Sequence, residues 1–167
     1  MTILIQPAQT HHIPAILEIY NEAVLNSTAS YDYEPSTLEQ RTQWFNHHQE
    51  LGLPVFVALD PADCVVGWGS LSKFRDKIGY QYTLEHSVYI AVDQRGQGIG
   101  SLMLQNLIDT ACGLGKHVLI GGVDSSNEAS LRLHKTFGFE EVARFKQVGF
   151  KYNRWLDVIF FQRFLNP

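Results

Sequence analysis

Cysteine is scarce in this sequence, and long apolar stretches are absent. The two cysteines, Cys64 and Cys112, have neither the spacing of a metal site nor that of a disulfide framework. No apolar run is long enough to cross a bilayer, and the N-terminus lacks the basic region and apolar core of a secretory signal. We therefore expect a cytoplasmic protein that binds no metal and no membrane.

Positive charge is also limited. The chain has 13 lysines and arginines against 17 aspartates and glutamates, a formal net charge of -4 at pH 7. Proteins whose main partner is nucleic acid carry a basic surface, so nucleic acid is not an expected partner. The apolar content of 45% is ordinary for a globular chain. With 167 residues and no repeat or linker, the sequence predicts one domain over residues 1–167.

Two helices are predicted in the N-terminal part. Thr10 can cap the first helix, with Pro14 in its first turn, and an apolar face follows at helical spacing. Ser36 and Glu39 fit a capping box, so a second helix is expected from there towards residue 50.

The rest of the chain combines strands with two more helices. The expected strands are residues 3–5, 55–59, 65–71, 83–92, 118–120, 141–148 and 156–164. A third helix is expected to bury a face made by Ile99, Leu102, Met103, Leu107 and Ala111. Asn127 can cap a fourth helix, which ends at Gly138. Early hairpin strands followed by alternating strands and helices predict an α/β protein with one mixed sheet covered by helices.

The run from Gln94 to Gly100 has glycines at alternate positions, between an apolar strand and an amphipathic helix. Glycine lets the backbone turn tightly and approach a ligand closely. The first N–H groups of the helix have no intrahelical acceptor, and the helix dipole favours anions. The run therefore predicts a pyrophosphate-binding site, with a simple tight turn as the alternative.

Two common phosphate-binding motifs do not fit this run. A P-loop needs Gly-Lys-Ser/Thr, whereas Ser101 and Leu102 follow Gly100 without a lysine. A dinucleotide-binding fold needs the spacing G-x-G-x-x-G early in the chain and an acidic residue about 20 positions later. Here the spacing is G-x-G-x-G, the motif comes late, and Asp124 follows an additional strand.

The same run resembles the acyl-CoA loop of the GNAT superfamily of N-acyltransferases, whose signature is Q/R-x-x-G-x-G/A. Residues 94–100 fill this pattern without a gap, and residues 127–139 resemble the family's helix on the cofactor side. The resemblance implies acetyl-CoA as the cosubstrate. It also implies a GNAT fold, a twisted mixed sheet of about seven strands flanked by about four helices and splayed open between its central parallel strands.

A narrower resemblance covers most of the chain. Residues 19–24, 83–90, 130–134 and 149–157 are similar to the phosphinothricin N-acetyltransferase branch, which includes enzymes acting on methionine sulfoximine and methionine sulfone. The resemblance implies an enzyme that acetylates the α-amino group of a small amino-acid-like acceptor by direct attack in a ternary complex. It also implies a homodimer.

Glu85 is the candidate general base. An amino-acid ammonium has a pKa of roughly 8 or above, so a base must remove a proton at neutral pH. Glu85 lies among apolar neighbours, which would raise its pKa, and the resemblance implies the same role. Strand alternation places His86 on the opposite face, where we interpret it as a packed or hydrogen-bonded histidine.

The resemblance assigns acetyl-CoA to backbone and loop residues. The backbone of Val88, Tyr89 and Ile90 would face the pantetheine and the thioester. N–H groups of the loop would hold the pyrophosphate, and these belong to Gly96, Gln97, Gly98, Ile99, Gly100 and Ser101. Arg95 would add charge, and Asn127 would contact the pantetheine arm. His134 stands where many superfamily members have a thiolate-protonating tyrosine, and it is expected to pack beside the cofactor.

The carboxylate of an amino-acid acceptor needs a cation. Arg75 is the expected anchor, helped by Lys77, because arginine offers a two-pronged match to a carboxylate. Phe74 and Arg75 correspond to a substrate-side segment of the branch, and Tyr31 lies in a loop that walls the pocket in relatives. Tyr89 shares the face of the candidate base.

Two other functions remain open at this level. One is acetylation of protein N-termini or polyamines, although polyamines would favour pocket carboxylates rather than the basic pair Arg75 and Lys77. The other is a non-catalytic CoA-binding module. The aromatic residues Phe160, Phe161 and Phe164 are candidates either for a dimer interface or for the core.

Overall fold

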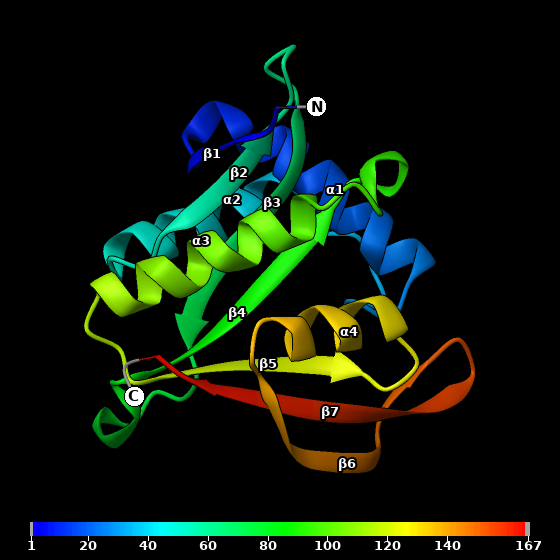
Figure 1. Cartoon of the computed structure of the whole chain (residues 1–167). Helices are drawn as coiled ribbons and strands as arrows, with labels where there is room; N and C mark the ends of the chain where they lie inside the picture. Colours follow the sequence, from blue (N-terminus) through cyan, green and yellow to red (C-terminus); the bar gives the residue numbers. More distant parts are fainter. Residues whose placement is uncertain (1, 166–167) are drawn as a thin grey trace.

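A computed structural model describes residues 2–165 and shows one seven-stranded sheet with helices on both faces (Figure 1). The strands are β1 (Leu4–Pro7), β2 (Val55–Leu59), β3 (Val65–Lys73), β4 (Thr83–Ile90), β5 (Val118–Asp124), β6 (Glu140–Lys151) and β7 (Arg154–Phe164). The α-helices are α1 (Ile13–Asn26), α2 (Leu38–Glu50), α3 (Ile99–Gly113) and α4 (Glu128–Thr136).

The sheet has the strand order β1-β2-β3-β4-β5-β7-β6, and β4 with β5 is its parallel pair. This pair is short: the last paired residues are Glu85 and Ile120, although β4 continues to Ile90 and β5 to Asp124. The two strands therefore diverge beyond Glu85, and their facing edges are left without strand partners. The mixed sheet that opens between its parallel strands is confirmed.

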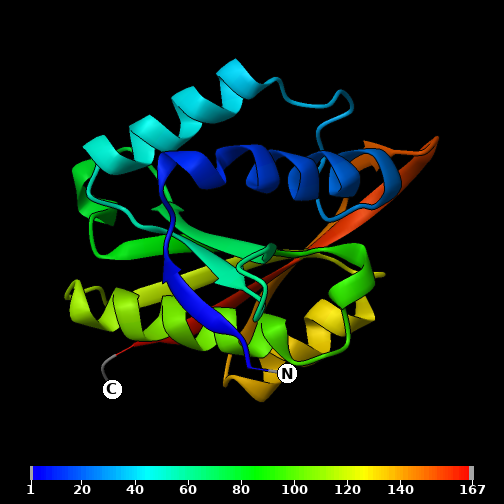
Figure 2. The same ribbon diagram turned by 90° about the horizontal axis from the view of Figure 1, so that it is seen from above.

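Two pairs of helices cover the sheet, α1 and α2 on one face, α3 and α4 on the other (Figure 2). Successive side chains of β3 point to opposite faces of the sheet, so β3 packs against both pairs of helices. Trp68 is buried with residues of α1 and α2, whereas a Cβ at Gly69 would lie 2.8 Å from Met103 of α3. Gly69 thus lets α3 pack closely against the sheet. None of the helices formed by residues 2–165 has the length and apolar character needed to cross a membrane.

Both predicted helix starts are wrong, by two residues in α1 and by one residue in α2. A 3₁₀ turn occupies Thr10–His12, so α1 begins at Ile13, with Pro14 in its first turn as expected. The capping box of α2 uses Thr37 and Gln40 rather than Ser36 and Glu39. Ser36 is engaged elsewhere, because the Asn21 side chain bonds both its N–H and its carbonyl group, at 2.8 and 2.9 Å.

Three further expectations need correction. Leu102 is 49% exposed, because the buried face of α3 runs through Leu104 and Ile108 instead. β4 ends at Ile90, before a 3₁₀ turn, rather than at residue 92. The last two strands are longer than expected, since a two-residue turn at Tyr152 and Asn153, both with positive φ, lets pairing continue to the hairpin tip.

Candidate active site

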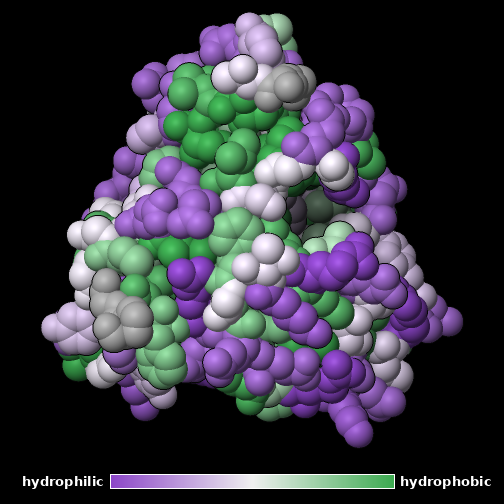
Figure 3. All heavy atoms as spheres, in the orientation of Figure 1, coloured by the Kyte–Doolittle hydropathy of each residue, from purple (hydrophilic) through white to green (hydrophobic). Residues whose placement is uncertain are grey.

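A cavity of about 710 Å³ opens where β4 and β5 diverge. We call it the strand cavity. Its walls come from β4, β5, α4, the β6–β7 hairpin and the loop after α1. The space-filling view shows this face of the molecule hollowed between its upper and lower halves (Figure 3). Residues from both diverging strands, β4 and β5, line the cavity. A ligand in it therefore contacts both edges of the gap between these strands.

Glu85 lines this cavity at the last residue pair before the strands part. Its carboxylate has no hydrogen-bond partner within residues 2–165. Burial raises the pKa of Glu85, and the positive charge of Arg75 opposes this shift. A carboxylate with a raised pKa is a better proton acceptor at neutral pH. The geometry therefore fits the role expected for Glu85.

His86 of β4 and His134 of α4 lie against each other, with their Nε2 atoms 3.0 Å apart. His134 donates its Nδ1–H to the Ser130 carbonyl at 2.7 Å, because a carbonyl can only accept. With both rings neutral, the proton between them belongs to His86, and Nε2 of His134 accepts it. Burial and the neighbouring ring lower the pKa of His86 to about 3, and burial lowers the pKa of His134. The interpretation of His86 as a hydrogen-bonded histidine is confirmed.

Gly121 makes room for this histidine pair. A Cβ at Gly121 would lie 2.5 Å from Nε2 of His134 and 2.7 Å from the His86 ring. Gly121 was not among the expected site residues, although two consecutive glycines inside an apolar strand are a signal of close approach.

The glycine run fits a diphosphate. Gly96 and Gly98 have φ values of 76° and 84°, and no atom lies within 4 Å of a Cβ built on either. Their N–H groups donate no hydrogen bond within the described residues, and α3 starts directly after them. Open space over unpaired N–H groups at a helix start is an anion site. Of the expected loop residues, Arg95 and Gly96 line the strand cavity, and Ile99 turns its side chain into the core.

The Arg95 side chain forms an ion pair and a hydrogen bond within the protein. Its Nη2 lies 2.7 Å from the Glu22 carboxylate, and its Nε donates to the carbonyl of Ile90 at 3.1 Å. These contacts fasten the start of the glycine run to α1 and to the end of β4. The side chain is thus partly neutralised before any phosphate arrives.

Asn127 lines the strand cavity and caps α4. Its Oδ1 accepts from the N–H of Ser130 at 3.1 Å, which confirms the expected cap. Val88, Tyr89 and His134 also line the cavity, whereas Ile90 does not.

Tyr31 forms part of the acceptor-side wall. Its ring lies on Gly149 of β6, where a Cβ would come within 2.8 Å of it, and burial raises the pKa of Tyr31 to about 12. Tyr89 stacks on Trp68, with ring centroids 4.7 Å apart, and donates its hydroxyl to the Ala29 carbonyl.

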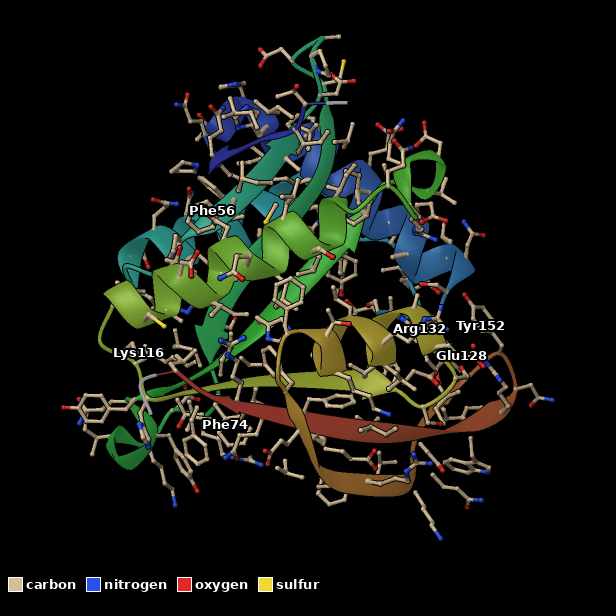
Figure 4. The ribbon with its side chains drawn as sticks, viewed as in Figure 1. Phe56, Phe74, Lys116, Glu128, Arg132 and Tyr152 are labelled. Carbon is tan, nitrogen blue, oxygen red and sulfur yellow. The ribbon has the colours of Figure 1, made fainter. Side chains whose placement is uncertain are left out.

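Three expected acceptor residues lie outside the cavity wall. Phe74, Arg75 and Lys77 do not line the strand cavity, and Arg75 and Lys77 are exposed. The Arg75 guanidinium lies 5.1 Å from the centre of the Phe74 ring. Figure 4 shows Phe74 well apart from Glu128 and Arg132 on α4. Arg75 nevertheless acts on the candidate base through its charge.

Asp124 was not expected in the site. It is buried at the end of β5 and lines the strand cavity. One carboxylate oxygen accepts from the N–H and hydroxyl groups of Ser126, and the other has no partner within residues 2–165. The sequence did contain a signal for this site residue: Asp124 is an acidic residue at the carboxyl end of a buried strand, three positions before the helix cap at Asn127.

Comparison with known proteins identifies the fold. A model of the acetyltransferase (GNAT) family matches residues 13–139. A methionine sulfoximine and methionine sulfone acetyltransferase from Pseudomonas paraeruginosa is 42% identical over 167 residues, which cover 100% of this chain and 97% of that protein.

Two solved structures have closely similar backbones. An N-acetyltransferase from Staphylococcus aureus has a TM-score of 0.97 and 40% identity, over 99% of this chain and 100% of that one. A phosphinothricin acetyltransferase from Sinorhizobium meliloti, in complex with acetyl-CoA, has a TM-score of 0.97 and 35% identity, over 99% of this chain and 90% of that one.

Proposed function

The chain belongs to the GNAT family of acetyltransferases, and from this premise we propose which reaction it carries out. It is an acetyl-CoA-dependent N-acetyltransferase. Its acceptor is the α-amino group of a small amino acid such as methionine sulfone, methionine sulfoximine or phosphinothricin. The relatives that act on these compounds match this chain over nearly its whole length.

The observation that carries this proposal is the desolvated carboxylate of Glu85 at the point where β4 and β5 part. In the proposed reaction Glu85 accepts a proton from the acceptor's ammonium group, directly or through water. The free amine then has a lone pair directed into the gap between the strands.

The amine attacks the thioester carbonyl of acetyl-CoA, which forms the C–N bond of the product and breaks the C–S bond. Coenzyme A leaves as the free thiol, with the proton that the nitrogen loses. The N–H groups of Gly96 to Gly100 and the start of α3 would hold its diphosphate. The β4 edge from Val88 to Ile90 would donate N–H groups to the carbonyl oxygen as negative charge develops there. Asn127 would offer its side-chain amide to the pantetheine arm.

His134 is a poor candidate for protonating the thiolate. Its Nδ1–H is donated to a backbone carbonyl, and its Nε2 accepts from His86. With no proton to give at neutral pH, His134 would shape the cavity wall beside the cofactor.

Direct transfer between the two substrates is supported by the position of the thiols. Cys64 is exposed, and Cys112 donates to the Leu165 carbonyl at the end of the core. Neither lines the strand cavity, so neither is placed to carry an acetyl group.

We also propose a homodimer formed through the C-terminal hairpin. β6 is an edge strand, and its hairpin exposes Val142, Phe150 and Trp155, none of which lines the strand cavity. Of the aromatic residues considered from the sequence, Phe161 is fully buried and Phe160 lines the strand cavity, which leaves Phe164 exposed. Light scattering of Val142→Lys against the unchanged chain tests this, since a dimer at this surface should dissociate.

The function is tested by thiol release from acetyl-CoA with amino-acid analogues as acceptors. Glu85→Gln should reduce kcat by about 10²–10⁴-fold while acetyl-CoA still binds, because only the proton acceptor is removed. Full activity of Glu85→Gln across pH would exclude Glu85 as the base. No thiol release with any amino acid would exclude the proposed acceptor class.

A further inference from the structure

A second cavity of about 360 Å³ lies beside the strand cavity, on the face covered by α1 and α2. We call it the Arg41 cavity. Ser87 and Tyr89 of β4 line both cavities, so the two are neighbours across these side chains. The Arg41 cavity is also lined by Ser70 and Ser72 of β3.

Strand register places the Arg41 cavity next to the candidate base. Ser72 is paired with Glu85, Ser70 with Ser87, and Trp68 with Tyr89. Side chains two residues apart on a strand share a face, so these pairs form one continuous floor. The floor begins at Glu85 and runs under the Arg41 cavity.

Arg41 is a buried cation without an ion-pair partner. It is 5% exposed, and no carboxylate of residues 2–165 forms an ion pair with it. Its guanidinium carbon lies 3.8 Å from the centre of the Tyr20 ring and 4.6 Å from that of Trp44. Burial lowers the pKa of Arg41, and Tyr20, Tyr89 and the Asp32 charge oppose this shift. Aromatic faces offset only part of the cost of removing a guanidinium from water.

Two residues that line this cavity each have a buried N–H donor that is unused. Nε of Arg41 and Nε1 of Trp68 have no hydrogen-bond partner in the part of the chain that is described. Trp68 is 2% exposed. Asp32 also lines the cavity, but it is exposed and accepts from the Tyr20 hydroxyl. Buried donors without acceptors are rare in folded proteins, and a ligand with oxygen acceptors would complete them.

We propose that Arg41 and Trp68 form a subsite that binds the oxygens on the sulfur or phosphorus atom of the acceptor's side chain. This rests on the proposed function. Such a subsite would let the enzyme separate methionine sulfone and phosphinothricin from amino acids of similar length that lack such oxygens.

The spacing of the floor favours the side chain over the α-carboxylate. The α-carboxylate is attached to the same carbon as the amine, so it stays near Glu85 and the charge of Arg75. The sulfur or phosphorus atom is separated from the amine by three carbons. One step along the floor, from Glu85 to Ser87, is about 6.8 Å, which brings that atom over the Ser70–Ser87 pair and towards Arg41.

Steady-state kinetics of Arg41→Met tests the subsite. Three acceptors are compared: methionine sulfone, the α-amide of methionine sulfone, and methionine. The change should raise the KM of both sulfone compounds at least tenfold and that of methionine less than threefold. An equal rise for methionine sulfone and methionine, a rise confined to the compounds with a free carboxylate, or no rise at all would overturn the subsite.

Wild-type turnover separates the two proposals. If the unchanged chain acetylates none of the three acceptors, the proposed function fails and the subsite falls with it. If it acetylates them and Arg41→Met does not discriminate, the subsite alone fails.

Trp68→Phe provides a second test that does not depend on the folding of Arg41→Met. It keeps the aromatic ring and removes only the indole N–H. We expect the KM of methionine sulfone to rise about threefold, with methionine unaffected and acetyl-CoA affinity unchanged. Equal effects on both acceptors would overturn the role of the indole.

Discussion

Two buried cations of this molecule, Lys151 and Arg41, differ in how fully their N–H donors are hydrogen-bonded. Lys151, at the end of β6, is 4% exposed, and its Nζ donates to the carbonyls of Val24, Ser27 and Ser30 at 2.6, 2.8 and 2.7 Å. Arg41, on α2, is equally buried and has an unpartnered Nε. We call Lys151 saturated because its ammonium group donates three hydrogen bonds, and it belongs to the scaffold. Arg41 is unsaturated, with a donor left unused, and it lies in a cavity beside the candidate base.

The position of Lys151 explains why it is saturated. The last carbonyls of a helix have no intrahelical donor and carry partial negative charge, so a cation is favourable at the end of α1. Lys151 thereby ties this end and the following loop to the C-terminal hairpin. The same loop carries Tyr31 into the wall of the strand cavity.

The largest effect should come from removing the saturated cation. Lys151→Met removes the donor that three buried carbonyls share and leaves only that of Ser27 with another donor, the Tyr152 hydroxyl, so the free energy of unfolding should fall by about 3 kcal/mol or more in urea titration. Arg41→Met should change it by about 1 kcal/mol at most, in either direction, because no ion pair is lost. Lys146→Met, at an exposed position of β6, is the control. Equal losses at Lys151 and Arg41 would contradict the comparison.

The histidine pair extends the comparison to neutral groups. Because the pKa of His86 is about 3 in the folded chain, against 6.5 ordinarily, only the unfolded chain binds this proton between these pH values. Stability should therefore fall as pH decreases through this window. His86→Gln should reduce the slope by about 1.4 kcal/mol per pH unit, measured by urea titration from pH 6.5 to 4. The exposed His47→Gln should leave the slope unchanged, and an unchanged slope in His86→Gln would show that His86 is protonated in the folded chain.

A smaller effect is expected on the candidate base. Arg75 holds the pKa of Glu85 below the value that burial alone would set. Arg75→Ala should therefore shift the acid limb of kcat/KM to higher pH, so that activity falls more at pH 6 than at pH 8. Arg132→Ala, on the outer surface of α4, is the control (Figure 4). A parallel fall at all pH values would show that the charge of Arg75 acts on substrate binding alone.

The smallest effect is expected at the half-exposed pair of Arg95 and Glu22. Glu22→Gln should lower the free energy of unfolding by less than about 1 kcal/mol, because water screens such pairs. Thermal unfolding at low and high salt checks this, since the difference from wild type should shrink as salt increases. If Glu22→Gln lowered the free energy of unfolding by about 3 kcal/mol, the pair would be as important for stability as Lys151, which would contradict this prediction.

The elements of the fold were predictable because each has a local signal. Alternation in 83–92, the apolar run at 118–120 and the cap at Asn127 depend on neighbours within a few residues. One error occurred where a distant side chain took part. Asn21 engages Ser36 across 15 positions and moves the start of α2 to Thr37.

By itself, the sequence determined the glycine loop, the strand that carries Glu85 and the family that both resemble, because these depend on local backbone preference and residue order. Only the tertiary structure decided that His86 pairs with His134, that Lys151 is saturated and that Arg41 is not. Each of these depends on which groups from distant segments share a small volume from which water is excluded. Burial and pairing in that volume set the pKa values and leave particular donors free, and no periodicity in the sequence encodes them.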